Sequence, residues 1–277
     1  MVKCQTPSRN FCTPDGKNAA LFVDLDGTAV VCQPYFDEAA ENFAHFMSLR
    51  GFDAAEARKA CSEFNGSFMR EHGFERDVFP RALVAAYNHL VEKDNRRLRA
   101  DKRKLDERIV HNIGLGPFFR LPQLFSNCAA VLGRAHKGFL VFAVSMGNHE
   151  AQKYKIRQAG LDTIFDEAMI TSKADKPEIV KQVMEDWNIS PEYSAFIGNS
   201  RTADGACLAV TNFIYLPLEH GTEFDLSKEL PQSDFEVFEV KDWREAEEKG
   251  IKRLLRRRKA APEAAEPRAL SGKGCCK

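Results

Sequence analysis

The stretch LFVDLDGTAV, residues 21–30, closes an apolar run with two carboxylates, Asp24 and Asp26. A strand that is buried on both faces should not end in two acids unless something stabilises their charge, because neighbouring carboxylates repel each other. In open α/β sheets, ligands bind outside the carboxyl ends of the strands. A divalent cation is the simplest partner, since Mg²⁺ prefers oxygen ligands and usually takes one or two carboxylates. The alternative is an ordinary turn with two solvated acids.

The length and charge of the chain bound the kind of protein it can be. Its 277 residues suffice for one sizeable domain, or for a core domain with a smaller one inserted. The 40 Lys and Arg residues balance 40 Asp and Glu residues, so there is no overall bias toward nucleic acid or an anionic membrane. Residues 251–277 depart from this balance: nine Lys and Arg against two Glu give +7, which leaves −7 for residues 1–250.

The cysteines and the apolar runs bear on location. The eight cysteines form no CxxC pair and no regular framework, which is typical of reduced thiols in an intracellular protein. The N-terminal residues are polar, and no apolar run approaches the ~18 residues that span a bilayer. We therefore expect a cytoplasmic protein without a membrane span. The cysteines and seven histidines have no ligand spacing, so a zinc site is not expected.

Apolar periodicity divides the chain into parts. Residues 19–25 form a continuous apolar run of the kind found in a buried parallel strand, whereas 33–116 repeat apolar residues at helical spacing. From 117 onward, strand-like and helix-like segments alternate, which implies βαβ units. The sequence therefore predicts an α/β fold, a Rossmann-like parallel sheet with an inserted all-helical domain. The expected parts are a flexible leader (1–18), the core (19–32 and 117–240), the insertion (33–116), and a charged helix end with a disordered basic tail (241–277).

Within the core, further elements are expected at definite places. The expected strands are 138–145, 167–172, 194–200 and 213–217, and the expected helices are 121–136, 149–160, 177–187 and 202–210.

Three more short motifs follow the first in chain order. Ser145 ends an apolar strand in FAVSMGN, Lys176 opens a helix in KADKPEIV, and IGNSRTADG contains Asn199 and Asp204. With D-x-D-G-T at Asp24, this set resembles the four motifs of the haloacid dehalogenase-like (HAD) hydrolase superfamily over about residues 19–220. The helical insertion resembles the C1 cap of that family. Four motifs in order are a far more specific signal than any one of them.

The resemblance implies a phosphatase-type reaction with definite roles. Asp24 would be the nucleophile that forms an aspartyl-phosphate, and Asp26 the acid and base that serves the leaving oxygen and then the water. Lys176 would be the catalytic cation. Ser145, Lys176 and the backbone N–H groups near Gly27 and Met146 would bind the phosphoryl oxygens. Mg²⁺ would be held by Asp24, the backbone carbonyl of Asp26, and the motif-four side chains of Asn199 and Asp204.

Asp26 separates reactions within the family, and Asn199 departs from its pattern. The family's dehalogenases lack an acid two residues after the nucleophile, so Asp26 favours phosphoester chemistry on a small phosphorylated metabolite. It does not separate a phosphatase from a phosphomutase of sugar phosphates. Asn199 stands where many members carry Asp, which removes one negative charge from the metal site. A third alternative is therefore a catalytically weak binding protein that uses its basic tail.

Several other residues are weighed and left out of the site. His149 follows the phosphate motif and Arg201 the fourth motif, but both are expected to be structural or solvated. The aromatic residues at the entry to the insertion are expected to be core: Tyr35, Phe36, Phe43 and Phe46. The basic run 256–259 could contact nucleic acid or acidic lipid, yet a solvated helix end is favoured. The terminal Cys-Cys-Lys is not a prenylation signal, and the oligomeric state is left open.

Overall fold

The computed structural model describes residues 17–73, 75–94, 99–172, 175–217 and 229–260. The expected leader falls almost entirely outside these residues. Residues 261–277, with the expected basic tail and the terminal cysteines, also lie outside them.

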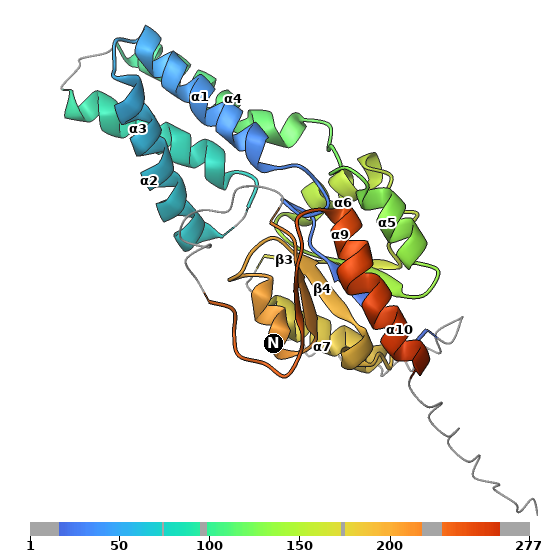
Figure 1. The fold of residues 1–277 in the computed structure, drawn as a ribbon. Coiled ribbons are helices and arrows are strands. Elements are labelled where there is room, and N and C mark those ends of the chain that lie inside the picture. Colours follow the sequence, from blue (N-terminus) through green and yellow to red (C-terminus); the bar gives the residue numbers. More distant parts are fainter. Residues whose placement is uncertain (1–16, 74, 95–98, 173–174, 218–228, 261–277) are drawn as a thin grey trace, which may run out of the picture.

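The core is built on a six-stranded sheet in which every pair of neighbours is parallel (Figure 1). The order of strands is β3-β2-β1-β4-β5-β6, so the first strand lies at the centre. Leu21 on β1 pairs with Val141 on one side and with Ala195 on the other. The strands are β1 (Ala20–Val23), β2 (Leu140–Met146), β3 (Glu167–Thr171), β4 (Ala195–Gly198), β5 (Asn212–Tyr215) and β6 (Val237–Glu239).

Both faces of the sheet are buried, which explains the continuous apolar run of the first strand. Leu21 and Val23 belong to one hydrophobic cluster and Phe22 to another, because alternate side chains of a strand point to opposite faces. The first cluster includes residues of α5 (Cys128–Ala135) and α6 (His149–Gln158), and the second includes residues of α7 (Lys176–Asp186). The result is a three-layer α/β/α core.

A four-helix unit is inserted after β1 and lies to one side of the sheet (Figure 1). It has its own hydrophobic cluster, with Phe43, Leu83, Tyr87 and Val110 at its centre. Asp53 caps the second helix by accepting a hydrogen bond from the Glu56 N–H at 2.8 Å, as the capping-box spacing of these residues implies. The helices are α1 (Gln33–Leu49), α2 (Ala54–His72), α3 (Val78–Lys93) and α4 (Ala100–Leu115). The expected fold class, a parallel α/β core with a helical insertion, is confirmed.

Three local expectations need correction. The helix expected over 202–210 is a 3₁₀ turn, η3 (Gly205–Ala209), followed at once by β5. The helix expected over 121–136 begins only at Cys128, because Asn127 has a left-handed φ of 68° that a helix interior does not allow. The short edge strand β6 was not expected at all.

The segment after residue 240 belongs to the core by its packing. It continues as α9 (Trp243–Glu245), a π-helical turn η4 (Ala246–Ile251) and α10 (Lys252–Ala260). Trp243, Ile251 and Leu254 are buried in the same cluster as Leu21. The hydrophobic core therefore continues past the expected boundary at residue 240. The apolar residues of this segment are separated by charged residues, so they give only a weak sequence signal.

Candidate active site

The carboxylate of Asp24 lies at the end of the central strand, next to the motif after β4. The Asp24 N–H donates to the carbonyl oxygen of Ile197 at 2.9 Å, which fixes the chain where β1 ends. The Thr28 hydroxyl lies 3.2 Å from Asp24 Oδ2 and 3.2 Å from Asn199 Oδ1. Thr28 thus brings two oxygen acceptors from distant parts of the chain to one point, although its single hydrogen can serve only one of them at a time.

Lys176 joins Asp24 to Asp204 in the interior. Its ammonium donates to Asp24 Oδ1 at 2.7 Å and to Asp204 Oδ1 at 2.6 Å, and all three side chains are at least nine-tenths buried. Lys176 reaches this position because it is the first residue of α7, whose N-terminus points at the carboxyl ends of the strands. The other oxygen of Asp204 accepts the Ser200 N–H at 3.0 Å.

Burial decides the protonation of this group of side chains. It raises the pKa of Asp24 to about 7 even though Lys176 opposes the shift, and the nearby Asp204 carboxylate adds to it. Burial disfavours the charged form of Lys176, but the attraction of Asp204 and Asp24 outweighs it and raises the lysine's pKa. One cation therefore serves two carboxylates, and a second cation would be needed to balance both.

Asp26 is held by a different set of side chains, which includes two from α6 and the thiol of Cys32. Gln152 Nε2 donates to Asp26 Oδ2 at 2.7 Å, and the Lys155 ammonium donates to Asp26 Oδ1 at 2.6 Å. The same amide of Gln152 lies 2.9 Å from Ser145 Oγ. Burial alone would raise the pKa of Asp26, but Lys155 and Gln152 stabilise the carboxylate and lower it. Ser145 and Asp26 are thus joined through one amide.

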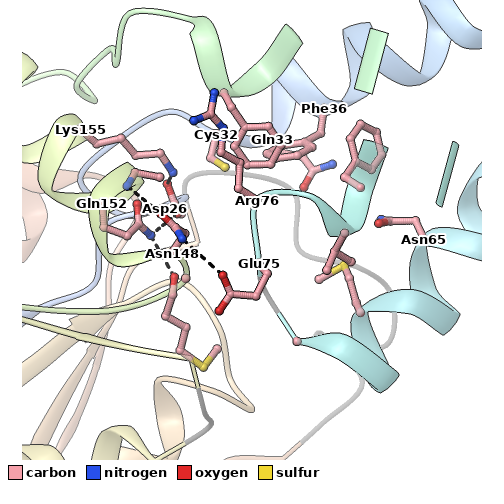
Figure 2. Close-up of a pocket in the computed structure, with 18 of the residues that line it drawn as sticks. Asp26, Cys32, Gln33, Phe36, Asn65, Glu75, Arg76, Asn148, Gln152 and Lys155 are labelled. Atoms are coloured by element: carbon pink, nitrogen blue, oxygen red, sulfur yellow. Dashed lines mark hydrogen bonds and ion pairs between the residues drawn. The ribbon is translucent and has the colours of Figure 1, made fainter. Parts of the chain in front are cut away.

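A cavity of about 300 Å³ opens beside Asp26, between the core and the helical insertion (Figure 2). Its core wall includes Asp26, Met146, Gln152 and Asn199. The insertion contributes apolar and polar side chains to the opposite wall: Phe36, Asn65, Met69, Glu75, Arg76, Val78 and Phe79. Asn148 Nδ2 donates to Glu75 Oε2 at 3.4 Å across the cavity. Of the three acids Asp24, Asp26 and Asp204, only Asp26 lines this cavity, so a small molecule in it would lie against the Asp26 carboxylate.

The structure brings most of the expected site residues into shared contacts, and Gly27 does not have the role expected of it. Two separate sets of contacts contain the expected residues: Asp24, Lys176, Asn199 and Asp204 in the first, and Asp26 and Ser145 in the second. Met146 lines the cavity. The N–H of Gly27, however, donates to the Val30 carbonyl oxygen at 2.9 Å, so it is engaged within its own loop. Gly27 has a φ of 79°, and its place here is to make that turn.

Among the residues that were left out, only those at the entry to the insertion need revision. Phe36 lines the cavity, while Phe43 and Phe46 are buried in the insertion's own cluster as expected. His149 is exposed and pairs with Glu150. Arg201 pairs with Glu239 and lies over the Tyr215 ring, away from the cavity.

Three residues of the site were missed from the sequence: Thr28, Gln152 and Lys155. Gln152 and Lys155 are three apart on α6, the helix that directly follows the strand-end Ser145. Gln152 is 2% exposed and lies one helical turn before the buried Ile156, but the sequence of α6 does not show that this polar residue is buried. Thr28 likewise gives no signal in a turn rich in polar residues.

The donor set fits a hard divalent cation. Asp24, Asn199 and Asp204 supply carboxylate and amide oxygens, the ligand type that Mg²⁺ prefers. The Thr28 hydroxyl leaves either Asp24 Oδ2 or Asn199 Oδ1 without its hydrogen, which is an acceptor that a cation can satisfy. Across the described ranges, no three His, Cys, Asp or Glu side chains gather as a ready-made metal cluster.

Comparison with known proteins shows the family to which the chain belongs. The model of a family of hydrolases, the haloacid dehalogenase-like hydrolases, matches residues 19–209. The chain therefore belongs to the haloacid dehalogenase-like hydrolases. A search of the curated proteins gives no match.

Solved structures show the same fold at low sequence identity. A haloacid dehalogenase-like family hydrolase from Xanthomonas campestris is 18% identical, with 89% of this chain and 96% of that chain covered at a TM-score of 0.68. YfnB from Bacillus subtilis bound to magnesium is 16% identical (83% and 96% covered, TM-score 0.54). The 2-haloacid dehalogenase from Pseudomonas syringae pv. Tomato is 14% identical (86% and 98% covered, TM-score 0.52).

Within the described part of the chain, no helix is long and apolar enough to cross a membrane.

Proposed function

We propose that the protein is a Mg²⁺-dependent phosphatase that hydrolyses a small phosphorylated metabolite through an aspartyl-phosphate on Asp24. The observation that carries the proposal is the position of Lys176, buried between Asp24 and Asp204, with the second acid Asp26 two residues along on the cavity wall. A buried carboxylate with an acid beside it and a cation behind it is what an in-line attack on a phosphate ester needs.

The reaction divides into two displacements. A carboxylate oxygen of Asp24 attacks phosphorus, and the bond between phosphorus and the ester oxygen breaks as a proton passes from Asp26 to that oxygen. Water then attacks the aspartyl-phosphate, Asp26 takes its proton, and inorganic phosphate leaves with Asp24 restored. Ser145 and Lys176 donate hydrogen bonds to the phosphoryl oxygens as negative charge moves onto them.

The lowered pKa of Asp26 suits the second half of this cycle, in which it must accept a proton. For the first half it must hold one. An anionic phosphoryl group brought next to a carboxylate disfavours its charged form, so bound substrate raises the pKa of Asp26. Because Asp26 lies next to the bound substrate, this one residue can serve as acid and then as base.

Mg²⁺ would be held by Asp24, Asn199, Asp204 and the backbone carbonyl of Asp26, and when bound it would neutralise the charge of two anions that must meet. The bound magnesium of YfnB, a neighbour in fold, supports this choice of metal. The amide of Asn199 in place of a carboxylate weakens the attraction for the ion, and Lys176 already occupies one side of the acidic pair.

The second acid favours a phosphate ester over a halide. A 2-haloacid dehalogenase is among the neighbours in fold, but that likeness bears on the fold alone. A leaving halide needs no proton, whereas a leaving alkoxide does, and Asp26 is placed at the cavity to supply it. A phosphomutase of sugar phosphates would use the same residues, and no feature of the described residues favours it over hydrolysis.

The alternative of binding through the basic end is weakened for the residues that are described. Arg257 donates to Glu236 at 2.6 Å and Arg258 donates to the Gly138 carbonyl, so both hold α10 on the core. The Glu236 carboxylate offsets the charge of Arg257, whereas the carbonyl group that Arg258 contacts is neutral.

The test is phosphate release from 4-nitrophenyl phosphate and from a panel of phosphorylated metabolites, with Mg²⁺ or with a chelator. Turnover is expected only with the metal and is expected to fall at least ~10³-fold in Asp24→Asn, which cannot form the acyl phosphate. Asp162→Asn, an exposed acid outside the site, is the matched control and should keep wild-type rates. Absence of Mg²⁺-dependent turnover on every compound would refute the proposal.

A further inference from the structure

The side-chain amide of Gln152 lies between Asp26, the proposed acid and base, and Ser145, which is proposed to bind the phosphoryl group. Its nitrogen is 2.7 Å from Asp26 Oδ2 (Figure 2). The same nitrogen is 2.9 Å from Ser145 Oγ and 2.9 Å from the Met146 carbonyl oxygen. The two N–H hydrogens of a primary amide are shared among these three acceptors, and the shortest contact is the one to the charged oxygen. One buried side chain therefore contacts both Asp26, the proposed acid, and Ser145, the proposed phosphoryl-binding residue.

The orientation of this amide is determined by its surroundings. Turned around, its oxygen would face a carboxylate and a carbonyl, both of which lack hydrogens to donate. Gly147 packs against the amide so closely that a Cβ at this position would lie 3.1 Å from Gln152 Nε2. The price of this orientation is that Gln152 Oε1 is buried without a hydrogen-bond partner among the described residues. A buried acceptor without a partner costs free energy, and such costs in native proteins call for an explanation other than stability.

Lys155, on the same helix as Gln152, also donates a hydrogen bond to Asp26. Positions three apart on a helix share one face, so Lys155 and Gln152 both face the loop after β1. The lysine donates to Asp26 Oδ1 at 2.6 Å, so each carboxylate oxygen has its own partner from α6. The carboxylate is therefore fixed in rotation and in position at the wall of the cavity.

The contact to Ser145 sets the direction of a second group. Because the Gln152 amide donates to the Ser145 oxygen, the hydrogen of that hydroxyl does not point at Gln152. The other acceptor near the serine hydroxyl is the Met146 carbonyl oxygen at 3.5 Å, which is a long and weak contact. Among the described residues, the serine hydrogen therefore has only this weak acceptor, although the side chain itself is buried.

We propose that Gln152 and Lys155 are positioning residues that align Asp26 for proton transfer to the leaving-group oxygen, with Gln152 also turning the Ser145 hydroxyl toward the phosphoryl group. This inference rests on the proposed function. It has a consequence that a purely structural role lacks. A misaligned acid slows the departure of a basic leaving group, which needs the proton, far more than that of an acidic one, which leaves without it.

The experiment compares two aryl phosphates that differ in the acidity of the phenol released. Phenyl phosphate releases the weaker acid and 4-nitrophenyl phosphate the stronger one. In Gln152→Met and Lys155→Met, kcat/KM for phenyl phosphate should fall about ten-fold or more further than kcat/KM for 4-nitrophenyl phosphate, within the range that general acid catalysis supplies. Lys155→Arg should restore part of the loss on phenyl phosphate, because it keeps a charged donor.

Matched controls come from exposed positions of the same helix. Gln158→Met and Lys153→Met repeat the two substitutions at exposed sites on α6 and should leave both esters at wild-type rates. Unfolding midpoints of all variants show whether the fold is kept. If Gln152→Met does not fold, Lys155→Met alone carries the comparison, since its side chain reaches the edge of the cavity.

Two results would overturn the inference, and they are distinguishable. If wild type hydrolyses both esters in an Asp24-dependent way but the variants slow both equally, or neither, then the positioning role is wrong and the proposed function stands. If wild type hydrolyses neither ester with Mg²⁺ present, the proposed phosphatase chemistry fails on these probes and the positioning role falls with it.

Discussion

At the scale of single residues, the main feature of the site is that its charged side chains are buried. Asp24 and Asp204 share Lys176, so the group carries one negative charge more than its cation balances when both acids are ionised. Burial makes that excess expensive, which is why the pKa of Asp24 rises to about 7. Nothing in the sequence gives the depth of burial of a strand-end acid. The residue type and its place at a strand end are predictable, but its protonation is not.

A prediction follows for the metal-free protein. The pKa of Asp24 is 3.8 when unfolded and about 7 when folded, so between these values the folded state binds more protons. The free energy of unfolding should therefore decrease as the pH rises from about 4 to about 7, by up to about 1.4 kcal/mol per pH unit for one proton. Above pH 7 both states are ionised at this residue and its contribution no longer changes.

The measurement is urea unfolding in chelator at a series of pH values for wild type and Asp24→Asn. Asp24→Asn is neutral throughout, so the difference in free energy between the two proteins isolates this carboxyl. Added Mg²⁺ should raise the stability of wild type more at pH 7.5 than at pH 5.5, since a proton no longer competes for the carboxylate. Parallel pH curves for the two proteins would contradict the assignment of the raised pKa to Asp24.

At the scale of elements, helix contacts inside the insertion depend on small residues. Gly114 in α4 lies against α3, where a Cβ at 114 would come 2.6 Å from Pro80 Cα. A backbone atom cannot move aside as a flexible side chain can. Gly114→Ala is therefore expected to destabilise the protein by about 1–3 kcal/mol, the usual cost of overpacking.

The neighbouring Gly116 provides the control for this prediction. A Cβ there would meet no atom within 4 Å, and its φ of −48° is one that alanine adopts readily. Gly116→Ala should be neutral or slightly stabilising in the same denaturation experiment. If the two substitutions had equal effects, the close approach of α3 and α4 would be refuted.

The elements that sequence predicted well are those whose signal is local and strong. The first strand falls within one to two residues of expectation, because an unbroken apolar run is a local pattern. The helix predicted over 202–210 is instead a 3₁₀ turn at 205–209. Its end is set by β5, which begins at Asn212 and pairs with β4. Tertiary pairing overrides local preference there, and β6 is likewise too short for a periodic signal.

For the site, motifs predicted the residues on strand ends and missed those on helix faces. Gln152 and Lys155 reach Asp26 from a helix 126 and 129 residues further along the chain. A contact of this kind depends on how α6 lies against the loop after β1, which spacing within one segment does not encode. The cavity wall contributed by the insertion was unpredictable for the same reason.

At the scale of the whole molecule, the C-terminal helices of the described chain contact the loop that follows β1. Trp243 of α9 is fully buried and donates its indole N–H to the Thr28 carbonyl oxygen at 3.0 Å. The Thr28 hydroxyl in turn contacts both Asp24 and Asn199. This hydrogen bond thus connects the C-terminal helices to the loop after β1, over 215 positions of sequence.

Trp243→Phe removes this N–H while keeping an aromatic ring in the core. The Thr28 carbonyl then loses its partner in a buried place, so the protein should be destabilised by about 1–3 kcal/mol. The Mg²⁺-dependent kcat/KM for 4-nitrophenyl phosphate should fall several-fold because the loop that carries Asp24 is less fixed. Trp187→Phe, beside the cluster on the opposite face of the sheet, is the matched control. It should keep wild-type kcat/KM whatever its effect on stability, and a variant of Trp243 with full activity would refute the connection.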